Sequence, residues 1–257
     1  MSKRRRAQLF RVLMYVVFVV ALVGVVTAAD WERISFYFLN AETARAMFPE
    51  VVTIAMRNTV IYTLSAFAFG MAGGLLLALM KLSSIAPYRW VASIYIEIFR
   101  GLPALVTIFL VAFAIPIAFT VRWSDLQKIT VGLGLVAAAY LAETLRAGIE
   151  GVPKGQMEAA RSLGMTHTRA MASIIIPQGF RLVIPPLTNE VVLLIKDTSL
   201  VFIIGVTLAS RELTKFGTDV ARTNATGLLV ISALYLALTV PLTRVVAGLE
   251  RRNARAR

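Results

Sequence analysis

Four long stretches of this 257-residue chain contain no Asp, Glu, Lys or Arg. One such charge at the centre of a membrane-spanning helix costs about 2.5–3.5 kcal/mol, so charge-free apolar runs of about 20 residues are typical of helices in a bilayer. The composition agrees, because 58% of the residues are hydrophobic and only 16% are charged. The uncharged runs are residues 12–29, 58–80, 101–121 and 223–243.

Two further apolar stretches are interrupted by charges. Residues 129–149 contain Glu143 and Arg146, and residues 187–210 contain Glu190 and the adjacent Lys196 and Asp197. Each stretch is long enough to cross a bilayer as a helix, and the apolar runs are far longer than a tilted membrane strand requires. Backbone groups in lipid must be satisfied within the segment, which also favours helices. The sequence therefore predicts an all-α integral membrane protein with six transmembrane helices.

The placement of basic residues predicts the topology. Lys and Arg outnumber Asp and Glu by 27 to 14. Because cytoplasmic loops of membrane proteins carry an excess of Lys and Arg, we place both termini in the cytoplasm, which puts most of the excess on that side. The basic residues are dispersed among loop ends and form no stripe with interleaved aromatic residues, so nucleic-acid binding is excluded. Cys is absent and His167 is the single histidine, which excludes disulfides and a metal cluster built on either residue.

The first apolar run has two interpretations. "KRRR", an apolar stretch and "TAA" resemble a signal peptide with a small-residue cleavage site, but the run is longer than a usual signal-peptide core, which favours a retained helix. The following "DWERISFYFLN" is typical of an interfacial segment at the outer leaflet. We expect an N-terminal helix with an external segment at residues 1–50, a transmembrane domain at 51–251 and a basic cytoplasmic tail at 252–257.

A polar stretch, "VPKGQMEAARSLGMTHTRAMASIIIP", separates the fourth and fifth predicted spans at residues 152–177. Pro153 favours a helix start, and Gly164 permits the left-handed backbone that ends many helices. Thr166 or Thr168 is suited to cap a second short helix, which we expect Pro177 to end. These signals predict a helix-turn-helix at the cytoplasmic membrane surface. The residues alone leave open a plain loop that reconnects two spans.

The spacing within this stretch resembles the EAA loop of bacterial ABC-importer permeases. Glu158-Ala159-Ala160 is followed after three residues by Gly164, and the pattern closes with Ile174 and Ile176-Pro177. The one departure is Ile176, where Leu is usual. The flanking "AAYLAETLRAGIEGVPKGQ" and "LLIKDTSLVFIIGV", and "EIFRGLPAL" earlier in the chain, resemble the polar amino-acid branch of that family. The resemblance extends over residues 58–251.

The resemblance implies a type I ABC-importer permease core in the bacterial cytoplasmic membrane. Such a permease pairs with a second permease chain, identical or homologous, and receives substrate from a solute-binding protein. A separate ATPase dimer binds ATP and Mg, so we expect no cofactor or enzymatic activity in this chain, which also lacks a "GxxxxGK[ST]" phosphate loop. The residues implied to couple it to the ATPase subunit are Glu158, Ala159, Ala160, Arg161, Gly164 and Met165.

The resemblance and the intramembrane charges both favour a polar amino acid as substrate. Ionisable residues inside a bilayer pair with one another or line a polar pathway, and both interpretations stay open here. We expect Lys196, Asp197 and Thr198 near the middle of the fifth span. The candidate pathway residues are Glu97, Arg100, Glu143, Arg146, Lys196, Asp197 and Thr198. An ion-coupled carrier or a channel would also contain intramembrane charges, although neither needs an exposed helix-turn-helix.

Glycines are frequent in the second and fourth predicted spans. Gly70, Gly73 and Gly74 lie in the second span, and Gly132 and Gly134 lie in the fourth. Small residues allow two membrane helices to approach closely, so we predict that these glycines serve packing and not substrate binding.

Overall fold

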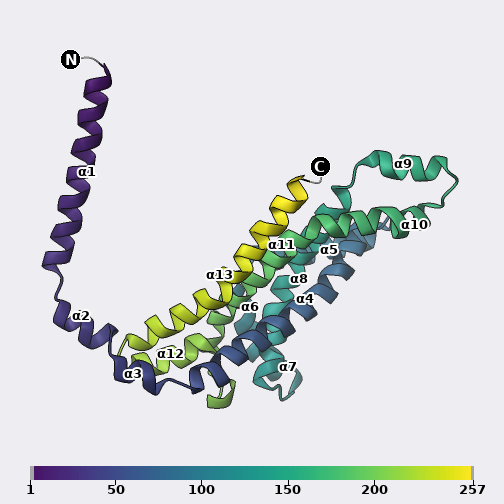
Figure 1. Ribbon diagram of the computed structural model, residues 1–257. Helices are drawn as coiled ribbons and strands as arrows, with labels where there is room; N and C mark the ends of the chain where they lie inside the picture. The colour runs from purple at the N-terminus through teal and green to yellow at the C-terminus, as the bar shows by residue number, and fades with distance from the viewer. Residues whose placement is uncertain (1–2, 256–257) are drawn as a thin grey trace.

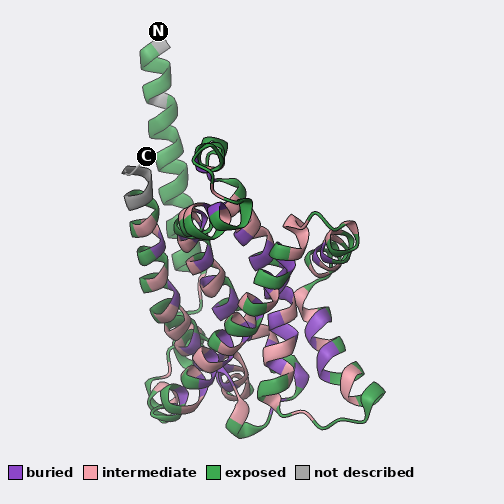
Figure 2. Cartoon of the chain, turned by 90° about the vertical axis from the view of Figure 1, so that its right-hand side faces the viewer, coloured by how far each residue is buried: buried purple, intermediate pink, exposed green. Residues whose placement is uncertain are grey.

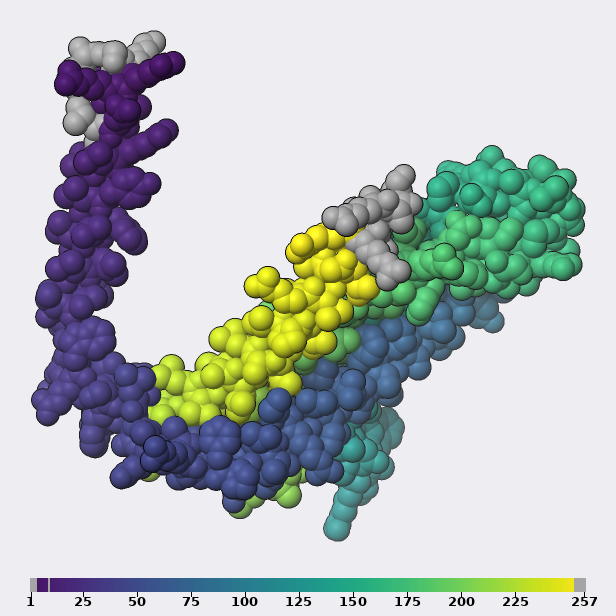
Figure 3. All heavy atoms as spheres, viewed as in Figure 1, coloured from purple at the N-terminus to yellow at the C-terminus, as the bar shows by residue number. Residues whose placement is uncertain are grey.

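The computed structural model describes residues 3–255, without the side chains of residues 3, 9 and 252–255, and its regular elements over that range are all helical. Helix α1 (Lys3–Ala28) stands clear of the other helices, as Figures 1 and 3 show. The short helices α2 (Trp31–Phe38) and α3 (Ala41–Ala46) connect it to them. The described side chains of α1 are exposed (Figure 2), and the exposed fraction of Phe18 is 65%. From Val12 onward the helix carries no charged residue, and this apolar surface is suited to lipid or to another membrane helix.

Two long helices form the centre of the bundle. The π-helical η1 (Val51–Met56) continues into α4 (Arg57–Leu82), which packs along α8 (Asp125–Glu150). A Cβ atom at Gly70 would lie 2.8 Å from the Ala137 Cβ atom, and one at Gly74 would lie 2.9 Å from the Leu141 Cβ atom. The two backbones therefore approach as closely as the predicted role of the glycines in packing requires.

The third apolar run follows a sharp bend. Helix α5 (Ala86–Gly101) meets α6 (Ala104–Phe109) at an angle of 107°. The chain then continues through the π-helical η2 (Leu110–Ala114) into α7 (Ile115–Phe119). Pro103, at the N-cap of α6, disfavours a helical backbone at the preceding residue, and Leu102 accordingly has an extended ψ of 140°, so α5 ends there. The uncharged run at residues 101–121 therefore becomes helical only from Ala104, after the bend.

The prediction for the fifth span is wrong in its boundaries. Helix α10 (His167–Ala170), the π-helical η3 (Met171–Ile175) and α11 (Ile176–Asp197) follow one another directly. Pro177 does not end the helix as expected, because it lies in the first turn of α11, where its missing N–H group is tolerated. Helix α11 ends at Asp197 and is followed by a 3-10 segment, η4 (Thr198–Ile204). Lys196 and Asp197 therefore lie at the end of a helix and not at the middle of one.

Two helices complete the chain. After the short η5 (Leu208–Ser210), α12 (Leu213–Ala221) leads to α13 (Thr226–Arg255). Because α13 continues to residue 255, the predicted boundary between the transmembrane domain and a tail at residue 252 falls within a helix. Residues 256 and 257 of that predicted tail lie outside the described residues.

Within residues 3–255, the helices long and apolar enough to cross a membrane are α1, η1 with α4, α8 and α13, and the bent α5 and α6–α7 pair adds a fifth candidate. Figure 1 places the N-terminus, the C-terminus and α9 (Lys154–Ser162) toward one edge of the molecule. Helices α3, α7 and α12 lie toward the opposite edge. The long helices connect these two edges.

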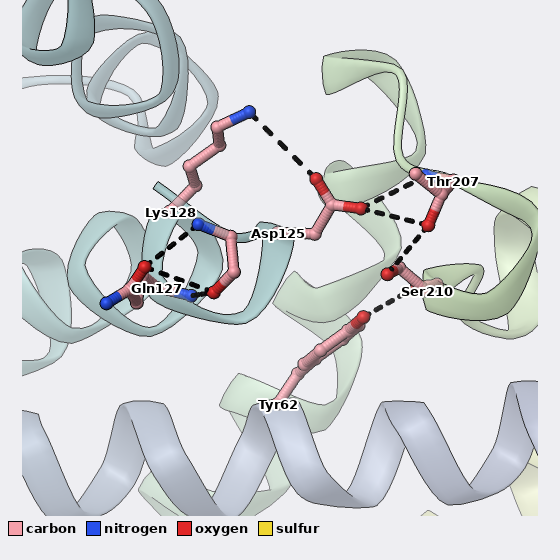
Figure 4. Close-up of polar contacts among 7 residues, drawn as sticks. Tyr62, Asp125, Gln127, Lys128, Thr207 and Ser210 are labelled. Atoms are coloured by element: carbon pink, nitrogen blue, oxygen red, sulfur yellow. Dashed lines mark hydrogen bonds and ion pairs between the residues drawn. The ribbon is translucent and has the colours of Figure 1, made fainter. Parts of the chain in front are cut away.

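At the edge opposite α9, the loop before α12 is attached to two helices (Figure 4). The Asp125 carboxylate of α8 accepts hydrogen bonds from the Thr207 N–H at 3.1 Å and the Thr207 hydroxyl at 3.2 Å. The Tyr62 hydroxyl of α4 donates to the Ser210 carbonyl at 2.6 Å, and the Asn58 amide donates to the Ala209 carbonyl at 2.8 Å. These contacts hold the loop across the ends of α4 and α8.

Candidate functional site

Two short helices form a hairpin from the polar stretch. Helix α9 has Pro153 at its N-cap, and α10 has Thr166 at its N-cap, where the Thr166 hydroxyl accepts from the Arg169 N–H. Between them Gly164 has φ of +80°, a conformation that costs a residue with a side chain roughly 1–2 kcal/mol. The helix start at Pro153 and the turn at Gly164 thus produce the predicted helix-turn-helix. Thr166, and not Thr168, caps its second helix.

The turn is fixed by local hydrogen bonds. The Arg161 guanidinium donates to the Met165 carbonyl at 2.9 Å, and the Met165 N–H donates to the Ala160 carbonyl at 3.1 Å. Ala160 is buried against the hairpin, whereas Glu158 and Ala159 are exposed. Figure 3 shows the hairpin projecting at one end of the molecule.

The tip of the hairpin carries an unusually exposed apolar side chain. Leu163, the C-cap residue of α9, is 84% exposed. Together with the exposed Glu158 and Ala159, it presents a small mixed surface away from the helical bundle. Leu163 is not one of the residues that define the sequence motif. Its exposure results from its position at the turn of the folded hairpin, which the motif alone does not give.

The charges of the fourth predicted span belong to a chain of ion pairs, here called the ladder, that consists of Lys81, Glu143, Arg146 and Glu150. The Glu143 carboxylate binds the Lys81 ammonium at 2.5 Å and the Arg146 guanidinium at 2.7 Å. Arg146 also binds Glu150, one helical turn further along α8, at 2.5 Å. The structure therefore pairs Glu143 with Arg146 and adds Lys81 from α4 as a third member. The ladder links α4 to the end of α8 that leads into the hairpin.

An open cavity of about 470 Å³ lies beside the ladder. Glu97 and Arg100 of α5 line it together with Lys81 and Glu143. The Arg100 guanidinium lies over the Tyr140 ring, 5.5 Å from the ring centroid, at a distance suited to a cation–π contact. Three of the predicted pathway residues, Glu97, Arg100 and Glu143, thus meet at one cavity.

A second cavity, of about 290 Å³, lies between α8 and α11. Tyr140 lines both cavities, so they adjoin one another. The charged residues in the lining of the second cavity are Glu190 and Asp197, both acidic. The remaining lining residues are apolar apart from Tyr140, among them Leu102 and Ala104 at the bend between α5 and α6.

The other predicted pathway residues lie elsewhere. Lys196 is exposed and lines neither cavity. Thr198 is buried, and its hydroxyl donates to the Ile195 carbonyl at 2.6 Å. Arg146 contributes to the ladder and not to a cavity wall. Among the described residues, no group of three or more His, Asp or Glu side chains is arranged to hold a metal ion.

Three polar residues that line the cavities were missing from the sequence-based set. Lys81 directly follows the uncharged run 58–80, so in the sequence it resembles a base at a loop end, although it reaches Glu143 on α8. Tyr140 carries no charge and therefore gave no signal. Glu190 had a signal that was available, since it lies seven residues before Asp197 and so on the same helical face.

Comparisons with known proteins agree with this architecture. The sequence family described as "Binding-protein-dependent transport system inner membrane component" matches residues 70–255. The L-cystine transport system permease protein TcyB of Bacillus subtilis (strain 168) is 38% identical over 174 residues, covering 68% of this chain and 70% of that protein. The probable glutamine ABC transporter permease protein GlnM of the same strain is 37% identical over 199 residues, covering 74% and 89%.

Solved structures show the same fold. A chain from the crystal structure of an amino acid ABC transporter with histidines has a TM-score of 0.74 at 34% identity, covering 83% of this chain and 98% of that one. A chain of the inward-facing MetNI methionine ABC transporter has a TM-score of 0.59 at 18% identity, which supports the fold alone. With a family match over most of its length, this chain belongs to the binding-protein-dependent transport system inner membrane components.

Proposed function

We propose that this chain is the transmembrane permease subunit of an ATP-driven importer of polar amino acids. Its curated relatives are named as permeases for L-cystine, glutamine, glutamate/aspartate and arginine. ATP and Mg are bound and ATP is hydrolysed by a separate ATPase dimer, so this chain performs no enzymatic step. It resides in the cytoplasmic membrane, as the family description states for its members.

The observation that carries the proposal is the exposed hairpin turned at Gly164. In this account α9 enters a groove on the ATPase subunit and transmits its closure to the bundle. Glu158 meets basic or polar groups there, and the exposed Ala159 permits close approach, whereas the buried Ala160 acts from within the folded hairpin. Gly164 sets the turn, and the bond from Arg161 to Met165 keeps it rigid. The nearby ladder supports this role, because it joins the end of α8 to α4.

The proposed topology has six spans and both termini in the cytoplasm. Helix α11 with η4 serves as the fifth span, although its charges set it apart from the more apolar helices. The common edge of the hairpin and both termini supports this orientation (Figure 1). We assign residues 1–50 to an N-terminal helix with an external segment and 51–251 to the transmembrane domain.

The substrate path in this proposal runs through the two adjoining cavities. A single chain offers few helices to enclose a polar path, so a second permease chain, identical or homologous, completes it. A solute-binding protein delivers the amino acid at the outer face. Glu97, Arg100, Glu143 and Asp197 line the cavities and remain pathway candidates, whereas Lys196, Thr198 and Arg146 act on the path only from outside the cavity walls.

Copurification tests the proposal. The tagged chain, expressed in membranes with its ATPase subunit, should copurify with that subunit. Glu158→Lys should weaken the association by reversing a charge, and Gly164→Val should weaken it by straining a positive φ angle. Glu42→Lys and Gly24→Val are matched controls, because both original residues are exposed and lie far from the hairpin in sequence.

All four variants should insert into the membrane normally. Loss of the ATPase subunit from the Glu158→Lys and Gly164→Val preparations, but not from the controls, supports the assignment. Retention of the subunit and of wild-type ATP-driven transport by both hairpin variants would refute it.

A further inference from the structure

Five arginines lie on the two long helices that the rest of the chain covers least. Among the described single helices that are long and apolar enough to cross a membrane, α1 and α13 are the least buried. Figure 1 places the N-terminal end of α1 and the C-terminal end of α13 toward the edge that also carries α9. The arginines near these two ends that are exposed and form no ion pair with another described residue are Arg4, Arg6, Arg11, Arg244 and Arg251, here called the arginine group.

Helix length places the arginine group at the surface of the bilayer. The uncharged part of α1, residues 12–28, is roughly 26 Å long, and that of α13, residues 226–243, is roughly 27 Å long. The hydrocarbon core of a bilayer is about 30 Å thick. When either uncharged part lies in that core, Arg11 and Arg244 lie where the core meets the phospholipid headgroups.

The same spacing of arginines occurs on both helices. Arg4 precedes Arg11 by seven residues, and Arg244 precedes Arg251 by seven residues. Positions seven apart lie on one helical face, so each helix presents a row of two guanidinium groups across the headgroup layer. The sequence of α1 contains no Asp or Glu, and that of α13 contains Glu250 as its single acidic residue. Positive charge therefore predominates along both rows.

Basic residues toward the opposite edge are arranged differently. The Arg211 guanidinium binds the Glu50 carboxylate at 2.8 Å, and the Lys215 ammonium binds the Asp219 carboxylate at 2.5 Å. The preference for bases on the cytoplasmic side requires their presence and not that they be unpaired. At the level of the headgroups, the unpaired guanidinium groups are free to bind anions from outside the chain.

The side chains next to the arginine group are apolar. Val12 follows Arg11 and Val245 follows Arg244, and both valines are exposed. An anion with an attached apolar chain satisfies both kinds of side chain, because its charge and its hydrocarbon adjoin at the same depth as theirs. A phospholipid has this structure, whereas an acidic protein surface offers only the charge.

We propose that the arginine group binds the phosphate groups of anionic phospholipids, whose acyl chains lie along the apolar parts of α1 and α13. A guanidinium donates two parallel hydrogen bonds to a phosphate group. Basic side chains next to a membrane helix attract lipids with a net negative charge more strongly than zwitterionic lipids. Such binding depends on the membrane location of the chain, and neither on its substrate nor on the ATPase.

Lipid titration tests the proposal. The full-length chain, purified in detergent with any subunit that remains bound to it, is titrated with pyrene-labelled phosphatidylglycerol and, separately, with phosphatidylethanolamine that carries the same label. Wild type should bind phosphatidylglycerol more tightly, and high salt should weaken this preference. Arg244→Gln/Arg251→Gln should lower the affinity for phosphatidylglycerol by about 10-fold or more. Arg244→Lys/Arg251→Lys keeps both charges and should retain most of the affinity.

A matched control separates position from net charge. Arg45→Gln/Arg122→Gln removes two exposed arginines that also form no ion pair within the described residues. Arg45 lies on α3 and Arg122 follows α7, toward the opposite edge, so this variant should bind phosphatidylglycerol as wild type does. The main test uses α13 because bases at the N-terminus also direct membrane orientation, which variants of α1 could change.

A preference for phosphatidylglycerol that is lost in the Gln variant of α13 and kept in its Lys variant supports the proposal. Equal affinity of wild type for the two lipids would overturn it, and so would unchanged affinity in the Gln variant. An equal loss in Arg45→Gln/Arg122→Gln would assign the effect to net charge and also overturn it. Release of a copurifying protein from the Gln variant, with lipid affinity unchanged, would assign the arginines to a protein partner.

Discussion

The two groups of charges within the helices of this chain are held in opposite ways. Glu143 of α8 is 20% exposed and is bound on both sides by Lys81 and Arg146. Glu190 and Asp197 of α11 face a cavity without such partners in residues 3–255. A charge that is paired within the protein is stabilised in the absence of a ligand, whereas an unpaired charge is available to one. The difference separates a structural ladder on α8 from a candidate binding surface on α11.

A fourth carboxylate, outside the membrane-spanning segments, extends the comparison. Glu212, at the N-cap of α12, is fully buried and accepts hydrogen bonds from the Thr214 and Lys215 N–H groups and the Tyr235 hydroxyl. Burial raises its pKa from 4.5 to about 7. It thus has neutral hydrogen-bond donors in place of the cations that bind Glu143.

This raised pKa predicts the largest stability effect. The folded protein retains a proton on Glu212 that the unfolded chain releases between pH 4.5 and about 7, so stability falls as pH rises through that window. The loss amounts to about 3 kcal/mol, and Glu212→Gln should remove it. Apparent melting temperatures of the purified protein from pH 4.5 to 8 measure the effect. Parallel pH profiles for wild type and variant would contradict it.

Breaking the ladder should have the next largest effect. Glu143→Gln leaves Lys81 and Arg146 close together without the carboxylate that joins them. We expect a loss of about 2 kcal/mol, below the range for fully buried pairs because these side chains remain partly exposed. The apparent melting temperature should fall accordingly. The double variant Lys81→Met/Glu143→Gln should recover part of the loss, and an additive loss would argue that the two side chains are not coupled.

The smallest stability effect is expected at Glu190. Because this carboxylate has no partner to lose within the described residues, Glu190→Gln should change stability by less than about 0.5 kcal/mol, or increase it slightly. The same melting assay at pH 7 provides the comparison with Glu143→Gln. A destabilisation equal to that of Glu143→Gln would remove the distinction between the two groups of charges.

The sequence predicted the features that depend on local chemistry. Charge-free runs located the helices that became α1, α4, α13 and the segment after Pro103, and Gly164 and Thr166 marked the hairpin. The N-terminal extent of α11 was missed because Pro177 was treated as a helix breaker. Proline is compatible with the first turn of a helix, where Pro177 lies. The separation of Lys196 from Asp197 also depends on which face of α11 meets α8. Which face of α11 meets α8 is decided by tertiary packing, and the spacing of charges in the sequence does not predict it.

The central claim is that this chain imports amino acids by coupling to a separate ATPase through the hairpin. Uptake of labelled amino acids into vesicles reconstituted with all subunits tests it most directly. We predict uptake that requires ATP on the ATPase side, persists when ionophores collapse the ion gradients, and is lost in Glu158→Lys. Uptake into vesicles that lack the ATPase subunit, driven by an ion gradient, would contradict the claim and support an ion-coupled carrier.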